Sequence, residues 1–226
     1  MKTHSTFFND KTISLIRDNL KTNKAAAEMA ARFIDETNEW MNLSYEELRG
    51  LVFSPELKRS WFVLSDGNCP ACGQSVPMYN WIYEPFRYPW KMKCPHCSEL
   101  FPKNDFESYY TSGLDQNGIF RHELADRSLL LNEEGGDFGV DDGNGWYDEN
   151  GRRYMFIGAY LSHARWRAQV KNGIQHLGFS YILTGNPEYA HKTGVLLDAI
   201  SRHWPDFDFY TQGIMYEQEY KSNGYV

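Results

Sequence analysis

Apolar residues recur every three or four positions in the first quarter of the chain and again in its last third. That spacing places them on one face of an α-helix. Ser44 and Glu47 stand at the spacing of a capping box, in which two side chains satisfy free N–H groups at a helix start. The pattern predicts helices over residues 11–22, 24–41 and 44–51, a helix opening at Ser54, and helices over residues 154–167, 169–183 and 188–204.

The link between the last two predicted helices is short. Gly185 suits the left-handed residue that ends a helix, and Pro187 suits the first turn of the next one. Helices joined by so short a turn run antiparallel. The predicted fold is therefore mainly α and built from antiparallel helical hairpins.

Residues 66–153 show a different pattern. Gly, Pro, Asn and Asp interrupt short aromatic segments such as residues 78–83 and 106–110, which predicts short strands or irregular loops. A segment of this length with little regular structure needs a further constraint to become compact. We therefore expect three parts: an N-terminal helical layer (1–65), a loop-rich insert (66–153) and C-terminal helical hairpins (154–226).

The only four cysteines lie in that insert as two C-x-x-C pairs, Cys69 with Cys72 and Cys94 with Cys97. Two intervening residues allow a tight turn to present both sulfurs on one side, while the amides of the turn offset the thiolate charge. Two such knuckles are typical of a zinc ribbon, in which four thiolates surround one Zn²⁺ tetrahedrally. Because four thiolates leave no open coordination position, we expect the Zn²⁺ to be structural.

Neighbouring residues support the knuckles. Pro70 and Pro95 preset the backbone of each turn, and Gly73 permits a positive φ. The alternatives are two disulfides or four free thiols, but a redox C-x-x-C is expected once, between a strand and a helix. His96 could replace a cysteine as ligand, although four cysteines make this unnecessary.

The stretch from Asp141 to Trp146 alternates acidic residues with glycine, as calcium loops do. The glutamate that closes an EF-hand loop belongs at the twelfth position, where this chain has Arg152. A hairpin turn at Asn144–Gly145 is the preferred interpretation.

The chain has 30 acidic and 23 basic residues and a formal net charge of −7, which argues against broad nucleic-acid binding. Its aromatic content of 16% suits a carbohydrate-binding surface, and equally a core filled with large rings. No apolar run approaches the ~20 residues of a membrane span. The first ten residues lack the apolar region of a secretory signal, so the sequence as written predicts a cytoplasmic protein.

Tyr160, His163 and Trp166 follow one another at intervals of three residues in a predicted helix. Tyr160 and His163 share a face, and Trp166 lies near it. Such a trio could bind a sugar by stacking and hydrogen bonding. The alternative is aromatic packing between helices, with a hydrogen-bonded histidine beside the rings.

Several segments carry a family resemblance. They are Cys94–Cys97, Leu100–Pro102, Asn104–Phe106, Tyr109–Tyr110, Ser112–Asp115, Gly118, Phe138–Gly143, Gly145–Trp146 and Tyr181–Ala190. Through them the chain resembles the N-terminal region of bacterial heparinase II/III-like polysaccharide lyases, over residues 61–205.

The resemblance implies an incomplete α/α toroid of helical hairpins that binds an acidic polysaccharide or oligosaccharide. Lyases of this family cleave uronic-acid glycosides by β-elimination, which needs a base for the C5 proton, a group that neutralises the carboxylate and an acid for the leaving oxygen. Their Tyr and His machinery lies mostly on later helices and a β-sandwich, so no catalytic residue can be assigned here. The implied protein is an N-terminal lyase fragment, inactive alone, from a family whose members are often periplasmic or secreted.

Two other functional classes remain open. A zinc-ribbon module that binds nucleic acid or protein would use Arg87, Lys91, Lys93 and Lys103, which flank the cysteines. A non-catalytic helical scaffold would bind glycans without cleaving them. Salt-dependent binding to nucleic acid, or the absorbance of a newly formed C4–C5 double bond, would distinguish these classes.

Overall fold

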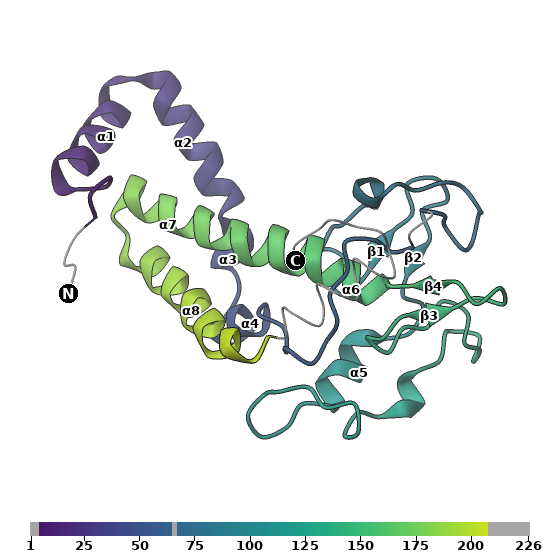
Figure 1. The fold of residues 1–226 in the computed structure, drawn as a ribbon. Coiled ribbons are helices and arrows are strands. Elements are labelled where there is room, and N and C mark those ends of the chain that lie inside the picture. Colours follow the sequence, from purple (N-terminus) through teal and green to yellow (C-terminus); the bar gives the residue numbers. More distant parts are fainter. Residues whose placement is uncertain (1–4, 65–66, 208–226) are drawn as a thin grey trace. The chain divides into compact units, whose positions relative to one another are not determined.

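The computed structural model describes residues 5–64 and 67–207. It is mainly helical with two small antiparallel sheets, which confirms the predicted fold class at this level (Figure 1). The described residues form two compact units: a helical unit (residues 5–51 and 170–200) and a loop-rich unit (residues 52–64, 67–169 and 201–207). The described residues of the predicted insert all lie in the loop-rich unit, whereas those of the predicted N-terminal and C-terminal parts contribute to both units. Residues 1–4, 65–66 and 208–226 of these three parts lie outside the described residues.

The helical unit contains hairpins of helices. Its elements are α1 (Asp10–Thr22), α2 (Lys24–Glu36), α3 (Asn38–Met41), α4 (Tyr45–Gly50), α7 (Asn172–Thr184) and most of α8 (Pro187–His203). Asn23 joins the first two helices, since its N–H donates to the Asn19 carbonyl and its side chain accepts the N–H of Ala26. Both α1 and α2 contact α7. The predicted capping box of Ser44 and Glu47 is present at the start of α4.

Two long cationic side chains cap helix ends within this unit. Gly185 ends α7 in the left-handed conformation, and Arg17 donates from Nε to the carbonyl of Ile182 in the last turn (2.9 Å). Lys192 is buried, and its ammonium donates to the carbonyl of Met41 at the end of α3 (2.7 Å). Both contacts join segments about 150 residues or more apart in sequence.

The predicted helix over residues 24–41 is interrupted at Thr37. The hydroxyl of this buried residue donates to the Phe33 carbonyl (2.9 Å) and lies 2.9 Å from the hydroxyl of Ser180 on α7. A threonine hydroxyl that bonds the preceding turn tends to bend a helix, and here it also makes a tertiary contact. Residues 24–41 therefore form α2 and α3 instead of one helix.

Close packing marks one glycine of α7. A Cβ added to Gly173 would lie 2.4 Å from Nε1 of Trp40 and 3.1 Å from Cδ1 of Leu196 on α8. At Gly178, on the same helix, a Cβ would meet nothing within 4 Å. Gly173 is therefore required by packing, whereas Gly178 is not.

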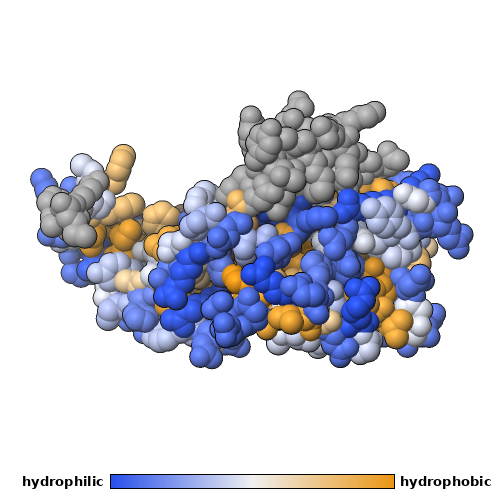
Figure 2. Space-filling model, turned by 60° about the horizontal axis from the view of Figure 1, so that its bottom comes forward, coloured by the Kyte–Doolittle hydropathy of each residue, from blue (hydrophilic) through white to orange (hydrophobic). Residues whose placement is uncertain are grey.

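Apolar side chains also remain accessible between helices of this unit. They line a groove of about 430 Å³ formed by Phe8, Ile16, Leu20, Ala26, Met29, Ala30, Phe33, Phe179, Ile182 and Leu183. Elsewhere, apolar residues are interspersed with hydrophilic ones on the face that Figure 2 draws. Among the described residues, no helix is both long and apolar enough to cross a membrane.

The loop-rich unit has many short elements. They are η1 (Met78–Asn80), β1 (Met92–Lys93), β2 (Leu100–Phe101), α5 (Phe106–Ser112), η2 (Arg127–Leu129), β3 (Trp146–Tyr147), β4 (Arg153–Tyr154), α6 (Phe156–Tyr160), the π-helical η3 (Leu161–Lys171, up to Gln169) and η4 (Trp204–Asp206). In the two sheets, Met92 pairs with Phe101 and Trp146 pairs with Tyr154. The break predicted between residues 167 and 169 is absent, because η3 continues through it.

Aromatic rings fill the core of this unit. Phe101 stacks on Phe156 with ring centroids 4.7 Å apart, and Trp90 lies 4.9 Å from Tyr110. Cys69 and Cys94 belong to the same buried cluster. Much of the aromatic content noted in the sequence therefore serves packing.

Two local predictions in this unit were wrong. Residues 106–110, predicted as strand or loop, begin α5, because Asp105 caps the helix by accepting the N–H of Ser108 (3.1 Å) and the apolar side of the helix faces the core. The helix predicted to open at Ser54 is a turn. The Ser54 hydroxyl accepts the N–H of Glu56 (3.5 Å) and that of the remote Phe120 (3.1 Å), and no helix follows over residues 55–64.

The predicted hairpin turn at Asn144–Gly145 was also misplaced. The chain reverses between β3 and β4, where the N–H of Asp148 donates to the Arg152 carbonyl (3.0 Å). The Asp148 carboxylate holds this turn by accepting the N–H groups of Asn150 and Arg152, each at 2.9 Å. An aspartate that organises its own turn in this way is a common alternative to Asn-Gly.

Candidate metal centre

Both C-x-x-C pairs adopt the same backbone turn. In the first knuckle, residues 69–74, the N–H of Cys69 donates to the Gln74 carbonyl (2.9 Å) and the N–H of Gly73 donates to the Cys69 carbonyl (2.9 Å). The same two bonds recur in the second knuckle, residues 94–99, at 2.9 and 3.0 Å. Two segments with different sequences thus fold into equivalent sulfur-bearing turns.

The residue after the second cysteine of each knuckle is left-handed. Gly73 has φ of +70°, as the sequence predicted, and Ser98 has φ of +63°. A side chain disfavours this region because its Cβ approaches the following carbonyl oxygen. A Cβ at Gly73 would meet no atom within 4 Å, so any cost of a side chain there comes from the backbone alone.

Short β-structure holds each knuckle in place. The second knuckle is the turn between β1 and β2, and the first is flanked by a bridge between Asn68 and Ser75. Nε2 of His96 lies 3.1 Å from the Ser75 carbonyl oxygen and so links the knuckles. His96 is not among the residues that could hold a metal ion.

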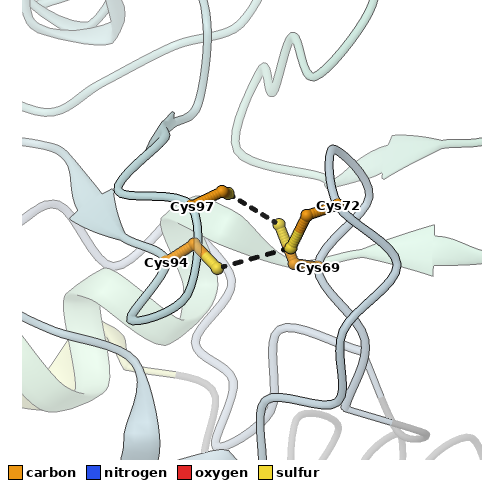
Figure 3. Close-up of side chains that lie close together, drawn as sticks. All are labelled: Cys69, Cys72, Cys94 and Cys97. Atoms are coloured by element: carbon orange, nitrogen blue, oxygen red, sulfur yellow. Dashed lines mark hydrogen bonds between the residues drawn. The ribbon is translucent and has the colours of Figure 1, made fainter.

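The four cysteine sulfurs converge on one point (Figure 3). Sγ of Cys69 and Sγ of Cys97 lie 3.8 Å apart, those of Cys72 and Cys94 lie 4.0 Å apart, and all four are within 4.8 Å of one another. No disulfide joins them. Four sulfurs about 2.3 Å from one tetrahedral ion would be about 3.8 Å apart, whereas a disulfide needs about 2.05 Å. The spacing matches a metal site and excludes a disulfide in this structure.

The thiols differ in environment. Burial raises the pKa of Cys69, whose side chain lies in the core. At Cys94, burial also opposes ionisation, but the N–H groups of Cys97 and His96 outweigh it and lower the pKa. The His96 N–H lies 3.4 Å from the Cys94 sulfur, as expected of a knuckle amide that stabilises a thiolate. A bound cation would favour the thiolate form of all four groups.

The basic residues that flank the knuckles have partners within the loop-rich unit. Arg87 and Lys93 both lie near Glu84, at 3.6 and 2.9 Å, and Lys103 pairs with Glu99. Lys91 donates to two backbone carbonyl oxygens at 2.6 Å. These cations therefore do not form an uncompensated basic patch.

The structure separates the three residues singled out for sugar binding. Tyr160 has no exposed surface, and its ring stacks on Trp90 with centroids 5.7 Å apart. Trp166 is partly buried and packs against the core cluster. His163 is 8% exposed, and its Nε2 lies 2.9 Å from the Trp61 carbonyl oxygen. Tyr160 thus offers no surface to a ligand in this structure.

Other rings surround His163 instead. Its centroid lies 5.3 Å from that of Trp61, 5.8 Å from Tyr79 and 5.2 Å from Tyr83, and the Arg167 guanidinium lies 5.8 Å from the Trp61 ring. Tyr79 is 65% exposed and Arg167 is exposed. We call these five residues the His163 surface. Burial lowers the pKa of His163, so its imidazole is neutral at pH 7.

Asp141 organises the acidic stretch that resembled a calcium loop. Its fully buried carboxylate accepts N–H groups from Gly143 (2.7 Å) and Gly145 (2.9 Å) at Oδ1, and from Ile157 (2.9 Å) at Oδ2. The last of these N–H groups belongs to the first turn of α6. The carboxylate therefore serves as a loop anchor and helix cap.

Comparisons with known proteins add no relative. No family model matches the chain, and no curated protein and no solved structure matches it.

Proposed function

We propose that Cys69, Cys72, Cys94 and Cys97 bind one Zn²⁺ and that the ion is a structural part of the loop-rich unit. The observation that carries the proposal is the convergence of four sulfurs at the spacing of a tetrahedral thiolate site. Four sulfur ligands favour zinc or iron over magnesium or calcium, which prefer oxygen. With every ligand position filled by protein, the ion has no site for substrate or water.

The surroundings support a structural role. Both sheets of the loop-rich unit have two strands of two residues each, and hairpins of this size are marginal by themselves in water. The second knuckle is the turn of one of these sheets. Metal binding would fix that turn and, through the buried Cys69 and Cys94, connect it to the aromatic core.

Metal analysis of the purified full chain tests this proposal. We expect one zinc per chain, loss of zinc in Cys97→Ser, and retention of zinc in the matched variant His96→Ala, because His96 is not a ligand. Cobalt substitution should give the spectrum of a tetrahedral thiolate site, whereas bound iron would colour the protein as isolated. Absence of stoichiometric metal, or zinc retained by Cys97→Ser, would refute the assignment.

We further propose that the chain is the N-terminal part of a lyase that cleaves uronic-acid glycans, and that its His163 surface contacts the sugar. The helical hairpins of the helical unit are consistent with part of a toroid. Aromatic rings stack on sugar faces, and a guanidinium such as that of Arg167 pairs with carboxylates. On this proposal, the catalytic residues of the lyase lie outside this sequence.

Affinity electrophoresis in gels containing uronate polymers tests this second proposal. We expect retardation of the wild-type chain, weaker retardation of Tyr79→Ala and Arg167→Ala, and no change for Tyr147→Ala, which removes an exposed ring in the β3–β4 hairpin. No rise in ultraviolet absorbance from a C4–C5 double bond is expected from this chain alone. Equal retardation of all variants would show that the His163 surface does not contact the polymer. Salt-sensitive binding to RNA or DNA would favour the zinc-ribbon module that binds nucleic acid.

A further inference from the structure

Each knuckle has one buried and one reachable cysteine. Cys69 is 1% exposed and Cys94 is 0% exposed, whereas Cys72 and Cys97 are only partly buried. Zinc-bound thiolates remain nucleophiles, and oxidation of cysteine follows thiolate character and exposure. A small oxidant such as a hydroperoxide therefore meets the sulfurs of Cys72 and Cys97 first.

Each reachable sulfur lies against the buried sulfur of the other knuckle (Figure 3). Cys97 lies 3.8 Å from Cys69, and Cys72 lies 4.0 Å from Cys94. The two sulfurs of each pair are therefore close enough for a two-step reaction. One sulfur is oxidised to a sulfenic acid, and the other then attacks it and displaces hydroxide. The pairing runs across the knuckles instead of within a C-x-x-C unit.

We propose that the four-cysteine site is also a site of oxidative modification, at which hydroperoxides convert the metal-bound thiolates into two disulfides, Cys69–Cys97 and Cys72–Cys94. In each pair, the reachable thiolate attacks the peroxide, takes one oxygen to become a sulfenic acid and releases hydroxide or alkoxide. The buried thiolate then attacks that sulfur and releases hydroxide. Two thiolates lose two electrons, and one peroxide O–O bond is reduced.

This inference rests on the proposed zinc site and predicts a definite consequence. A disulfide sulfur no longer carries the charge that binds Zn²⁺, so the ion leaves as the first pair forms. The two cross-knuckle bonds close loops between residues 28 and 22 positions apart, the same segments that the metal joins. The two knuckles should therefore remain folded in the oxidised, metal-free protein, whereas removing zinc from the reduced protein should unfold them and the core packed against them.

Peptide mapping of the full chain decides the matter. Trypsin cuts after Arg59, Arg87, Lys93 and Lys103, so one knuckle lies in peptide 60–87 and the other in peptide 94–103. After treatment with hydrogen peroxide and blocking of free thiols, cross-knuckle disulfides hold the two peptides together without reductant, whereas bonds within a knuckle leave them separate. Fragmentation of the joined species identifies the paired cysteines. Diamide, which oxidises thiols and spares methionine, serves as the second oxidant.

We expect loss of one zinc per chain, measured with a chromophoric chelator, on the same time course as the joined peptide. Zinc loss with separate peptides, or zinc retained at a peroxide dose that oxidises the free synthetic peptide 94–103, would overturn the inference and leave the structural zinc site intact. A purified protein without zinc would overturn both. Near-ultraviolet circular dichroism adds a further condition: if the oxidised form loses the aromatic signal as fully as the chelated form does, the cross-knuckle bonds do not replace the metal.

Discussion

The left-handed residue of each knuckle offers a reciprocal test of the metal site. Gly73→Ser places a side chain at φ of +70°, and Ser98→Gly removes one from φ of +63°. A left-handed conformation costs a residue with a Cβ about 1–2 kcal/mol, and the smaller unfolded-state entropy of a non-glycine residue returns about 0.4–1 kcal/mol. The net effect is about 1 kcal/mol at each position, with opposite signs. No steric term is added at Gly73, because its Cβ would lie in open space.

If zinc binding requires both turns to be formed, this energy should appear in the zinc affinity. We expect Gly73→Ser to bind zinc about fivefold more weakly and Ser98→Gly to bind it up to about fivefold more tightly, since 1.4 kcal/mol corresponds to a factor of ten. The double swap should return close to wild type. Competition against a chelator of known affinity at fixed pH measures all three variants.

Gly118 supplies the matched control. It has φ of +75° and open space at its Cβ, and it lies outside both knuckles, so Gly118→Ser carries the same backbone cost without touching the site. Its zinc affinity should equal that of wild type, although its folding stability falls. Equal weakening in Gly118→Ser and Gly73→Ser, or no weakening in Gly73→Ser, would refute the reasoning.

Three further predictions follow from single groups. Burial raises the pKa of Asp141 to about 6 against the opposing effect of its three N–H donors, so the carboxylate is ionised at pH 7.5. At that pH, Asp141→Asn, which loses one charged acceptor, should lower the free energy of unfolding measured in urea by about 2 kcal/mol. A loss no larger than that of Asp142→Asn would contradict this prediction. Because burial lowers the pKa of His163, protonation opposes folding: its contribution is complete above about pH 6.5 and is lost as pH falls, by up to about 1.4 kcal/mol per pH unit. His163→Gln should reduce the slope of stability between pH 7 and 5.5, and an unchanged slope would disprove the assignment. Gly173→Ala should lower the melting temperature, because the clash of its Cβ costs about 1–3 kcal/mol of folding free energy. Gly178→Ala should raise the melting temperature, because the higher helix propensity of alanine adds up to about 1 kcal/mol of folding free energy. The opposite order would show that packing does not require a glycine at position 173.

Features that depend on a few neighbouring residues could be predicted from the sequence. The capping box at Ser44 and Glu47, the positive φ of Gly73 and the left-handed end of α7 at Gly185 all occur as expected. Convergence of the cysteines could also be anticipated, because two C-x-x-C turns have few other uses together. In each case the interacting groups lie within about four residues, or a metal ion supplies the reason for a longer contact.

Features that depend on residues far apart in the sequence could not be predicted in this way. The Thr37 hydroxyl, at the interruption between α2 and α3, contacts the remote Ser180, and the ring contacts of His163 come from residues 61, 79 and 83. Helical spacing alone placed Tyr160 beside His163, yet the core of the loop-rich unit encloses Tyr160 completely. The periodicity gave the direction of a face and did not show what would cover it.

The burial of the cysteines explains why the metal site and the core should behave as one structure. Cys69 and Cys94 pack in the same cluster as the aromatic rings, and the turn at Cys94 connects the two strands that pair Met92 with Phe101. Phe101 in turn stacks on Phe156 in the first turn of α6. If the sulfurs separate, Cys94 moves and displaces Phe101 through the β1–β2 hairpin. The loss of packing then extends beyond the knuckle into the core. A zinc site of this kind acts as a long-range core contact between segments with almost no sheet of their own. In the reduced protein, loss of the metal and loss of the packing that connects Cys94, Phe101 and Phe156 should therefore occur in one cooperative transition.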